Sequence, residues 1–130
     1  MKQYNDISAQ DISWVKSNKS VLEPIKGIRH LYYPESMSEL TGLVGEFEAA
    51  QSPYLIIGWS SNTLFLPSFK MDNVICTKHL KHWEETDTHI VCDCGVNVSQ
   101  LSKEMVRKGY VGFEGLTDLP GTIAAAVYGN

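Results

Sequence analysis

The sequence has no apolar stretch close to the roughly 20 residues needed to cross a bilayer. Its first residues, MKQYNDISAQ, also lack the apolar segment of a secretory signal. Basic residues are few and scattered, because 11 Lys and Arg stand against 15 Asp and Glu, for a net charge of -4. Such a surface has little with which to neutralise a phosphodiester backbone. We therefore expect a cytoplasmic protein with neither a membrane nor a nucleic acid as partner.

Cysteine is scarce, and the three that occur cannot all pair within one chain. An odd count argues against a secreted disulfide framework, so we expect reduced thiols. Cys92 and Cys94 alternate in the strand-like segment HIVCDCGV, which predicts two small core residues on one face. A zinc site is the alternative, since six potential ligands lie between residues 76 and 94: Cys76, His79, His82, His89, Cys92 and Cys94. Their spacing matches no familiar zinc finger, so no metal site is predicted.

Internal repeats, low-complexity segments and linkers of distinct composition are also missing. At 130 residues, with 43% hydrophobic and 20% charged residues, the chain fits a single globular domain with a real core.

The hydrophobic pattern predicts strands mixed with two clear helices. Residues 1–20 are polar, with a helix start at Ser8 or Asp11. Strands are expected in IRHLYYP, PYLIIG, TLFLP, DNVICT and HIVCDCG, and KHLKHWEE reads as a solvated connection. One helix follows the capping box of Ser36 and Glu39. The other begins at Asn97 and ends at Gly109, with one face formed by Val98, Leu101, Met105 and Val106. This order indicates an α+β fold.

Two segments rich in small residues interrupt this pattern. The first, Gly58 to Asn62 in LIIGWSSNTLF, is either a hairpin turn or a loop that binds an anion. A hairpin needs only two residues, whereas GWSSN offers five, with two hydroxyls, an amide and several main-chain N–H groups. In the second, Pro120, Gly121 and Thr122 precede the alanine-rich helix IAAAV. A helix start of this kind is either a structural turn or a site that welcomes phosphate.

The alanine-rich helix has barely begun when the sequence reaches Gly129 and Asn130. We therefore expect a fold that is incomplete at the C-terminus. An uncovered apolar helix face also favours self-association, so a homo-oligomer is a further expectation.

The two segments, taken in order, resemble a known family. LIIGWSSNTLF corresponds to a strand, a G-x-G-S-N loop and a strand, and GFEGLTDLPGTIAAAV corresponds to G-L-E-x-L-x-x-I-P-G-T-V-G-G-A. YYPESMSEL upstream and the helix at 98–108 also agree in order and spacing. From residue 28 to residue 130 the chain resembles the UDP-N-acetylenolpyruvoylglucosamine reductase (UDP-N-acetylmuramate dehydrogenase) family, whose members are flavin enzymes of peptidoglycan synthesis and cell wall biogenesis.

The resemblance implies a p-cresol-methylhydroxylase-type (PCMH-type) FAD-binding fold with two small α/β subdomains. These would be residues 28–80 and the start of a second at 81–130, after a polar extension at 1–27. It implies noncovalent FAD, NADPH as electron donor in a complete enzyme, and reduction of UDP-N-acetylglucosamine enolpyruvate. An FAD-dependent sugar or alcohol oxidase or dehydrogenase of the wider family is one alternative. A degenerate, noncatalytic binding module is another.

By position, the family motifs assign FAD contacts to Gly58, Trp59, Ser60, Ser61, Asn62, Pro120, Gly121, Thr122, Ala124 and Asn130. Ser60 stands where the family loop has its second glycine, and Ala124 and Ala125 replace a glycine pair. A residue pressed against a diphosphate at positive φ is usually glycine, so these changes predict weakened binding. No residue is assigned a catalytic role, and the 130-residue chain is expected to be inactive as an oxidoreductase without a substrate domain. Glu114 is expected to hold a loop.

Overall fold

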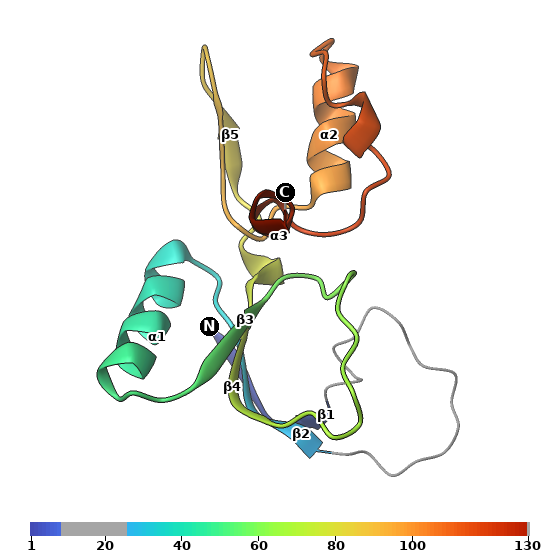
Figure 1. The fold of residues 1–130 in the computed structure, drawn as a ribbon. Coiled ribbons are helices and arrows are strands. Elements are labelled where there is room, and N and C mark those ends of the chain that lie inside the picture. Colours follow the sequence, from blue (N-terminus) through green and yellow to red (C-terminus); the bar gives the residue numbers. More distant parts are fainter. Residues whose placement is uncertain (9–25, 130) are drawn as a thin grey trace.

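A computed structural model describes residues 1–8 and 26–129, and its first part is a four-stranded mixed sheet (Figure 1). The strands are β1 (Lys2–Ser8), β2 (Lys26–Tyr33), β3 (Tyr54–Ile57) and β4 (Met71–Cys76). They lie in the order β1-β2-β4-β3, with β2, β4 and β3 parallel and β1 antiparallel to β2. The sequence pattern gave no signal for β1, and the helix expected after Ser8 falls in residues 9–25, outside the described part.

Helix α1 (Met37–Ala49) covers one face of this sheet (Figure 1). The predicted cap is confirmed, since Ser36 Oγ accepts a hydrogen bond from Glu39 N at 3.2 Å. Glu39 Oε2 accepts in turn from Glu35 N at 2.8 Å, one residue before the cap position. Leu40 and Leu43 are the buried residues of the helix, and they form one apolar cluster with Ile75 and Leu80.

Gly42 lies within α1, and a Cβ built there meets nothing within 4 Å. Replacing Gly42 by alanine should stabilise the protein by about 0.5–1 kcal/mol, because glycine loses more backbone entropy in a helix than alanine does. Urea unfolding of the two proteins would measure this gain. An unchanged or lower unfolding midpoint would contradict the open environment seen at this position.

The other face of the sheet is covered by the irregular chain between β3 and β4, where Phe65 is 6% exposed and packs edge-to-face against Phe69, with ring centroids 4.9 Å apart. A strand was predicted at TLFLP, and this prediction is wrong. The segment does alternate, because Leu64 and Leu66 are exposed on either side of buried Phe65. It crosses the sheet instead of pairing with it, so it packs one aromatic ring without joining the hydrogen-bond ladder.

The second part of the molecule is a hairpin with two helices (Figure 1). Its elements are β5 (Trp83–Glu85), β6 (Ile90–Cys92), α2 (Val98–Arg107) and α3 (Ile123–Gly129), with short 3-10 helices η2 (Thr77–His79) and η3 (Glu114–Leu116). KHLKHWEE is therefore not only a solvated connection, because it contains β5 and the fully buried Leu80.

Helix α2 follows the predicted boundaries. Asn97 Oδ1 accepts from Gln100 N at 2.8 Å, and the chain leaves the helix at Gly109, whose φ is +88°. Leu101 and Met105 are buried as expected, whereas Val106 is 37% exposed and does not belong to the buried face.

The cysteines pack as apolar side chains in different places. Strand β6 ends at Cys92, so Cys94 lies in the following turn and the two do not share a face, contrary to expectation. Cys92 contacts the cluster of Val96, Leu101 and Met105, whereas Cys94 contacts the cluster under α1. All three thiols are free, and burial raises the pKa of each. Within residues 1–8 and 26–129, no three His, Cys, Asp or Glu side chains are grouped to hold a metal ion.

None of the helices in the described part of the chain is both long enough and apolar enough to span a membrane.

Candidate functional site

The loop Gly58–Asn62 begins where β3 ends. It therefore lies at the end of the sheet that is formed by the carboxyl ends of the parallel strands β2, β4 and β3. In open α/β sheets this end is the usual place for a ligand. The second part of the molecule lies at the same end, with the chain around α3 next to it (Figure 1). The topology alone therefore puts the GWSSN loop between the two parts.

Two side chains that follow from β4 hold the start of this loop. Cys76 Sγ donates to Gly58 O at 3.3 Å, and Thr77 Oγ1 donates to Ile57 O at 3.2 Å. Both residues are buried. Neither residue could be predicted from the sequence to support the loop, because a small residue at the end of a strand gives no recognisable signal.

The loop itself presents polar groups that the chain does not use. Ser60 has φ +56°, the left-handed region that glycine adopts most easily. Within the described residues, the N–H groups of Ser60, Ser61 and Asn62 have no acceptor, and the buried Ser60 Oγ has no hydrogen-bond partner. Thr63 N donates back to Ser60 O at 3.3 Å and closes the turn. Successive free N–H groups at a bend of this kind are suited to an anion.

The second predicted segment lies directly against this loop. Ser61 Oγ donates to Pro120 O at 3.3 Å, although 59 positions separate the two residues. A Cβ at Gly58 would lie 2.7 Å from Thr122 Oγ1, and one at Gly121, where φ is +127°, would lie 3.2 Å from Ser61 Oγ. The two glycines therefore allow backbone contact between segments that the sequence placed far apart.

The N–H groups at the start of α3 already donate hydrogen bonds within the chain. Ile123 N donates to Val96 O at 2.9 Å, Ala124 N to Cys94 O at 3.2 Å, and Ala125 N to Thr122 Oγ1 at 3.3 Å. These three N–H groups are not available to an anion. The structural interpretation of the Pro120–Thr122 turn is therefore favoured, and the free donors belong to the GWSSN loop.

The remaining predicted residues are spread around this contact. Trp59 is half-buried, Asn62 and Ala124 are exposed, and Asn130 lies outside the described residues. Ala124 also lines an apolar cavity of about 690 Å³ between β6 and α3, together with Cys92, Cys94, Val127 and Tyr128. No residue of the GWSSN loop lines that cavity, so its volume does not mark the candidate site.

Lys78, in the 3-10 helix η2, has a contact within the chain. Its Nζ lies 4.8 Å from the centre of the Tyr33 ring, and the His79 ring stacks on Tyr33 at 5.0 Å. Burial raises the pKa of Tyr33 to about 12 and lowers that of His79. Both rings are therefore neutral near pH 7.

Glu114 holds its own loop, as expected, because its Oε2 accepts from Gly112 N at 2.7 Å.

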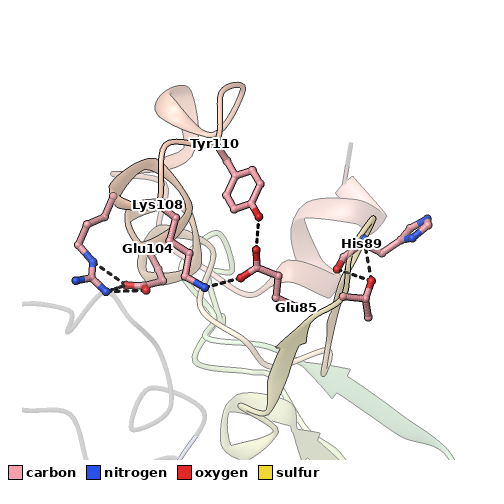
Figure 2. Close-up of polar contacts among 7 residues, drawn as sticks. Glu85, His89, Glu104, Lys108 and Tyr110 are labelled. Atoms are coloured by element: carbon pink, nitrogen blue, oxygen red, sulfur yellow. Dashed lines mark hydrogen bonds and ion pairs between the residues drawn. The ribbon is translucent and has the colours of Figure 1, made fainter.

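Further from the candidate site, a polar cluster ties the β5–β6 hairpin to the end of α2 (Figure 2). The Glu85 carboxylate accepts hydrogen bonds from Lys108 and Tyr110, and Glu104 pairs with Arg107 one turn away.

This cluster predicts a dependence of stability on pH. The bond from Lys108, followed by that from Tyr110, lowers the pKa of Glu85. The contribution of Glu85 is therefore complete above the unfolded carboxyl pKa and is lost as the pH falls through the lower folded value. In urea unfolding, wild type should exceed Glu85→Gln in stability at about pH 6 and lose that advantage as the pH falls through the lowered folded pKa of Glu85. A difference that stays constant with pH, or that grows with added salt, would contradict this electrostatic account.

The residues at the loop fit a diphosphate-bearing cofactor. Free donors, a buried hydroxyl without a partner in the described residues and two glycines at close backbone contacts meet at one edge of a parallel sheet. This combination defines a mixed α/β domain of the nucleotide-binding class. Residues 28–130 match the family described as the FAD binding domain, and the chain belongs to that family.

Three proteins similar to this chain share one name. The chain is 26% identical over 102 residues to the UDP-N-acetylenolpyruvoylglucosamine reductase of Caldicellulosiruptor saccharolyticus, covering 78% of this chain and 33% of the relative. It is 31% identical over 98 residues to that of Borrelia garinii subsp. bavariensis, covering 75% and 32%. It is 31% identical over 101 residues to that of Chlamydia muridarum, covering 76% and 34%. The chain thus spans about a third of the length of these relatives.

Proposed function

We propose that this chain is the FAD-binding portion of a flavin oxidoreductase similar to UDP-N-acetylenolpyruvoylglucosamine reductase. The observation that carries the proposal is the contact of the two glycine-bearing segments, through Ser61 and Pro120, beside three N–H groups that no described residue accepts from. The proposal includes the PCMH-type fold, with subdomains at 28–80 and from 81 onward. The edge strand β1 then extends the first subdomain by residues that lie before residue 28.

Each part of the site has a task in this proposal. The N–H groups of Ser60, Ser61 and Asn62 donate to the diphosphate, and Cys76 and Thr77 hold the loop in position from below. Pro120 to Ala124 close the site, and Ser61 fixes that closing segment to the loop. Binding is noncovalent. When bound, FAD supplies the ability to accept a hydride from one partner and deliver it to another.

The complete reaction belongs to the proposal for the parent protein. We propose NADPH as the donor, UDP-N-acetylglucosamine enolpyruvate as the acceptor and a cytoplasmic location. We propose no membrane or nucleic-acid partner. Val127 and Tyr128 on α3 are 75% and 96% exposed, which supports association through that helix.

A noncatalytic relative is the second candidate, and the buried Ser60 favours it. Ser60 occupies a position where the family motif has glycine, and its hydroxyl is buried. A nucleotide site that no longer binds its ligand would be expected to have such a residue.

Titration of the purified, flavin-free chain with FAD separates the two candidates. The proposal expects quenching of flavin fluorescence and a rise in melting temperature that grows with FAD concentration. Riboflavin, which lacks the diphosphate and the adenosine, serves as the control and should raise the melting temperature much less. If FAD neither binds nor shifts the melting temperature, the noncatalytic candidate replaces the proposal.

A further inference from the structure

The GWSSN loop contains two adjacent hydroxyls that the structure treats differently. Ser61 Oγ is committed, because it donates to Pro120 O at 3.3 Å. Ser60 Oγ is buried, and no donor or acceptor in the described residues pairs with it. The first hydroxyl therefore joins the two segments, and the second is left without a role in the chain itself.

Ser60 is also held in an unfavourable backbone conformation. Its φ of +56° lies in the left-handed region, where a Cβ crowds the following carbonyl. The residue is 6% exposed, so solvent does not satisfy its hydroxyl. A glycine would avoid both costs, and the family motif has glycine at this position. A serine that serves only to shape the turn thus gains nothing from its side chain.

The surroundings of the hydroxyl indicate what could satisfy it. Ser60 lies in the same bend as the N–H groups of residues 60, 61 and 62, which have no acceptor among the described residues, and its hydroxyl can also act as a donor. A ligand that presents several acceptor oxygens in one place, as a diphosphate does, is the matching chemistry. Serine has three staggered positions about χ1, so the direction of its hydroxyl can change when a ligand binds.

We propose that the Ser60 hydroxyl, at a position where the family motif has glycine, is an additional donor to the diphosphate of the bound dinucleotide and is covered until the ligand binds. The inference rests on the proposed function, since it takes FAD as the ligand. It predicts that serine at this position strengthens binding, whereas the sequence analysis expected serine to weaken it. The two expectations have opposite signs and one experiment separates them.

The test compares wild type with Ser60→Ala and Ser60→Gly, and uses Ser68→Ala, an exposed serine beyond the loop, as the matched control. Calorimetric titration gives the affinity for FAD, and thermal unfolding without ligand gives the stability of the free domain. We expect both Ser60 variants to bind FAD about tenfold more weakly than wild type, the loss typical of a hydrogen bond to a charged group. We also expect Ser60→Gly to melt at a higher temperature than wild type, because it removes the backbone strain and the unpaired hydroxyl.

The outcomes separate this inference from the proposed function. If wild type binds FAD and either Ser60 variant binds it as tightly or more tightly, the hydroxyl is not a donor and only the inference is wrong. If neither wild type nor Ser68→Ala binds FAD, the proposed function itself fails and the inference fails with it. A free-domain melting temperature that falls in Ser60→Gly would contradict the strain on which the argument depends.

Discussion

Replacing Gly95 by alanine is expected to cost about 3 kcal/mol or more of folding stability, at the upper end of what overpacking usually causes. A Cβ at Gly95 would lie 1.8 Å from Thr77 O and 2.7 Å from Leu80 O. Both are main-chain atoms, so no side chain can rotate away to make room. Urea unfolding should show a large drop in the midpoint, and the protein should not bind FAD under conditions where it is unfolded.

Gly115→Ala is the matched control, because a Cβ there meets nothing within 4 Å. It should leave the unfolding midpoint close to that of wild type. The account of Gly95 is contradicted if both glycine variants behave alike. That result would mean that the turn after β6 does not press on η2 as closely as the structure has it.

Gly58→Ala is expected to weaken FAD binding by tenfold or more, by forcing apart the two segments that meet at the site. The new Cβ would lie 2.7 Å from Thr122 Oγ1 and 3.1 Å from Thr122 Cγ2. Thr122 is 1% exposed and has little room to move. The affinity of the variant for FAD, measured by fluorescence titration against wild type, checks this expectation.

A double-mutant cycle with Thr122→Ala tests whether this one contact is the cause. Thr122→Ala removes both clashing atoms and also removes the hydroxyl that accepts from Ala125 N, a loss of about 1 kcal/mol for a helix cap. The double variant should bind FAD more tightly than Gly58→Ala alone. If the losses of FAD affinity in the two single variants simply add in the double variant, Gly58 acts through the conformation of the loop itself and not through contact with Thr122.

The elements that the sequence predicted well are those with local signals. The caps at Ser36 and Asn97 and the stop at Gly109 depend on residues within one turn, and the structure has all three. The strand predicted at TLFLP was wrong because an apolar run of strand length indicates burial but not whether a neighbouring strand is available to pair with it. Strand β1 was missed because it is an edge strand whose exposed side chains are mostly polar.

In the candidate site, too, features with a local sequence signal were predicted and features that depend on distant residues were not. The two glycine-bearing segments could be recognised from their motifs, and the structure brings them into contact. The support from Cys76, Thr77 and Gly95 could not be foreseen, because each acts across a distance in sequence that only the folded chain closes. The sequence left open whether the donors at the start of α3 serve a turn or an anion for the same reason, since distant carbonyls accept from two of them. The assignment of FAD contacts to individual residues stays a prediction.

The most direct test of the central claim is an amide NMR titration of the labelled chain with FAD, adenosine diphosphate and riboflavin. The account predicts that FAD and adenosine diphosphate shift the N–H resonances of Ser60, Ser61 and Asn62 most strongly, because their diphosphate accepts from these donors, and that riboflavin leaves them nearly unchanged. Shifts confined to the apolar cavity around Cys92 and Val127, with the loop amides unaffected by FAD, would contradict it.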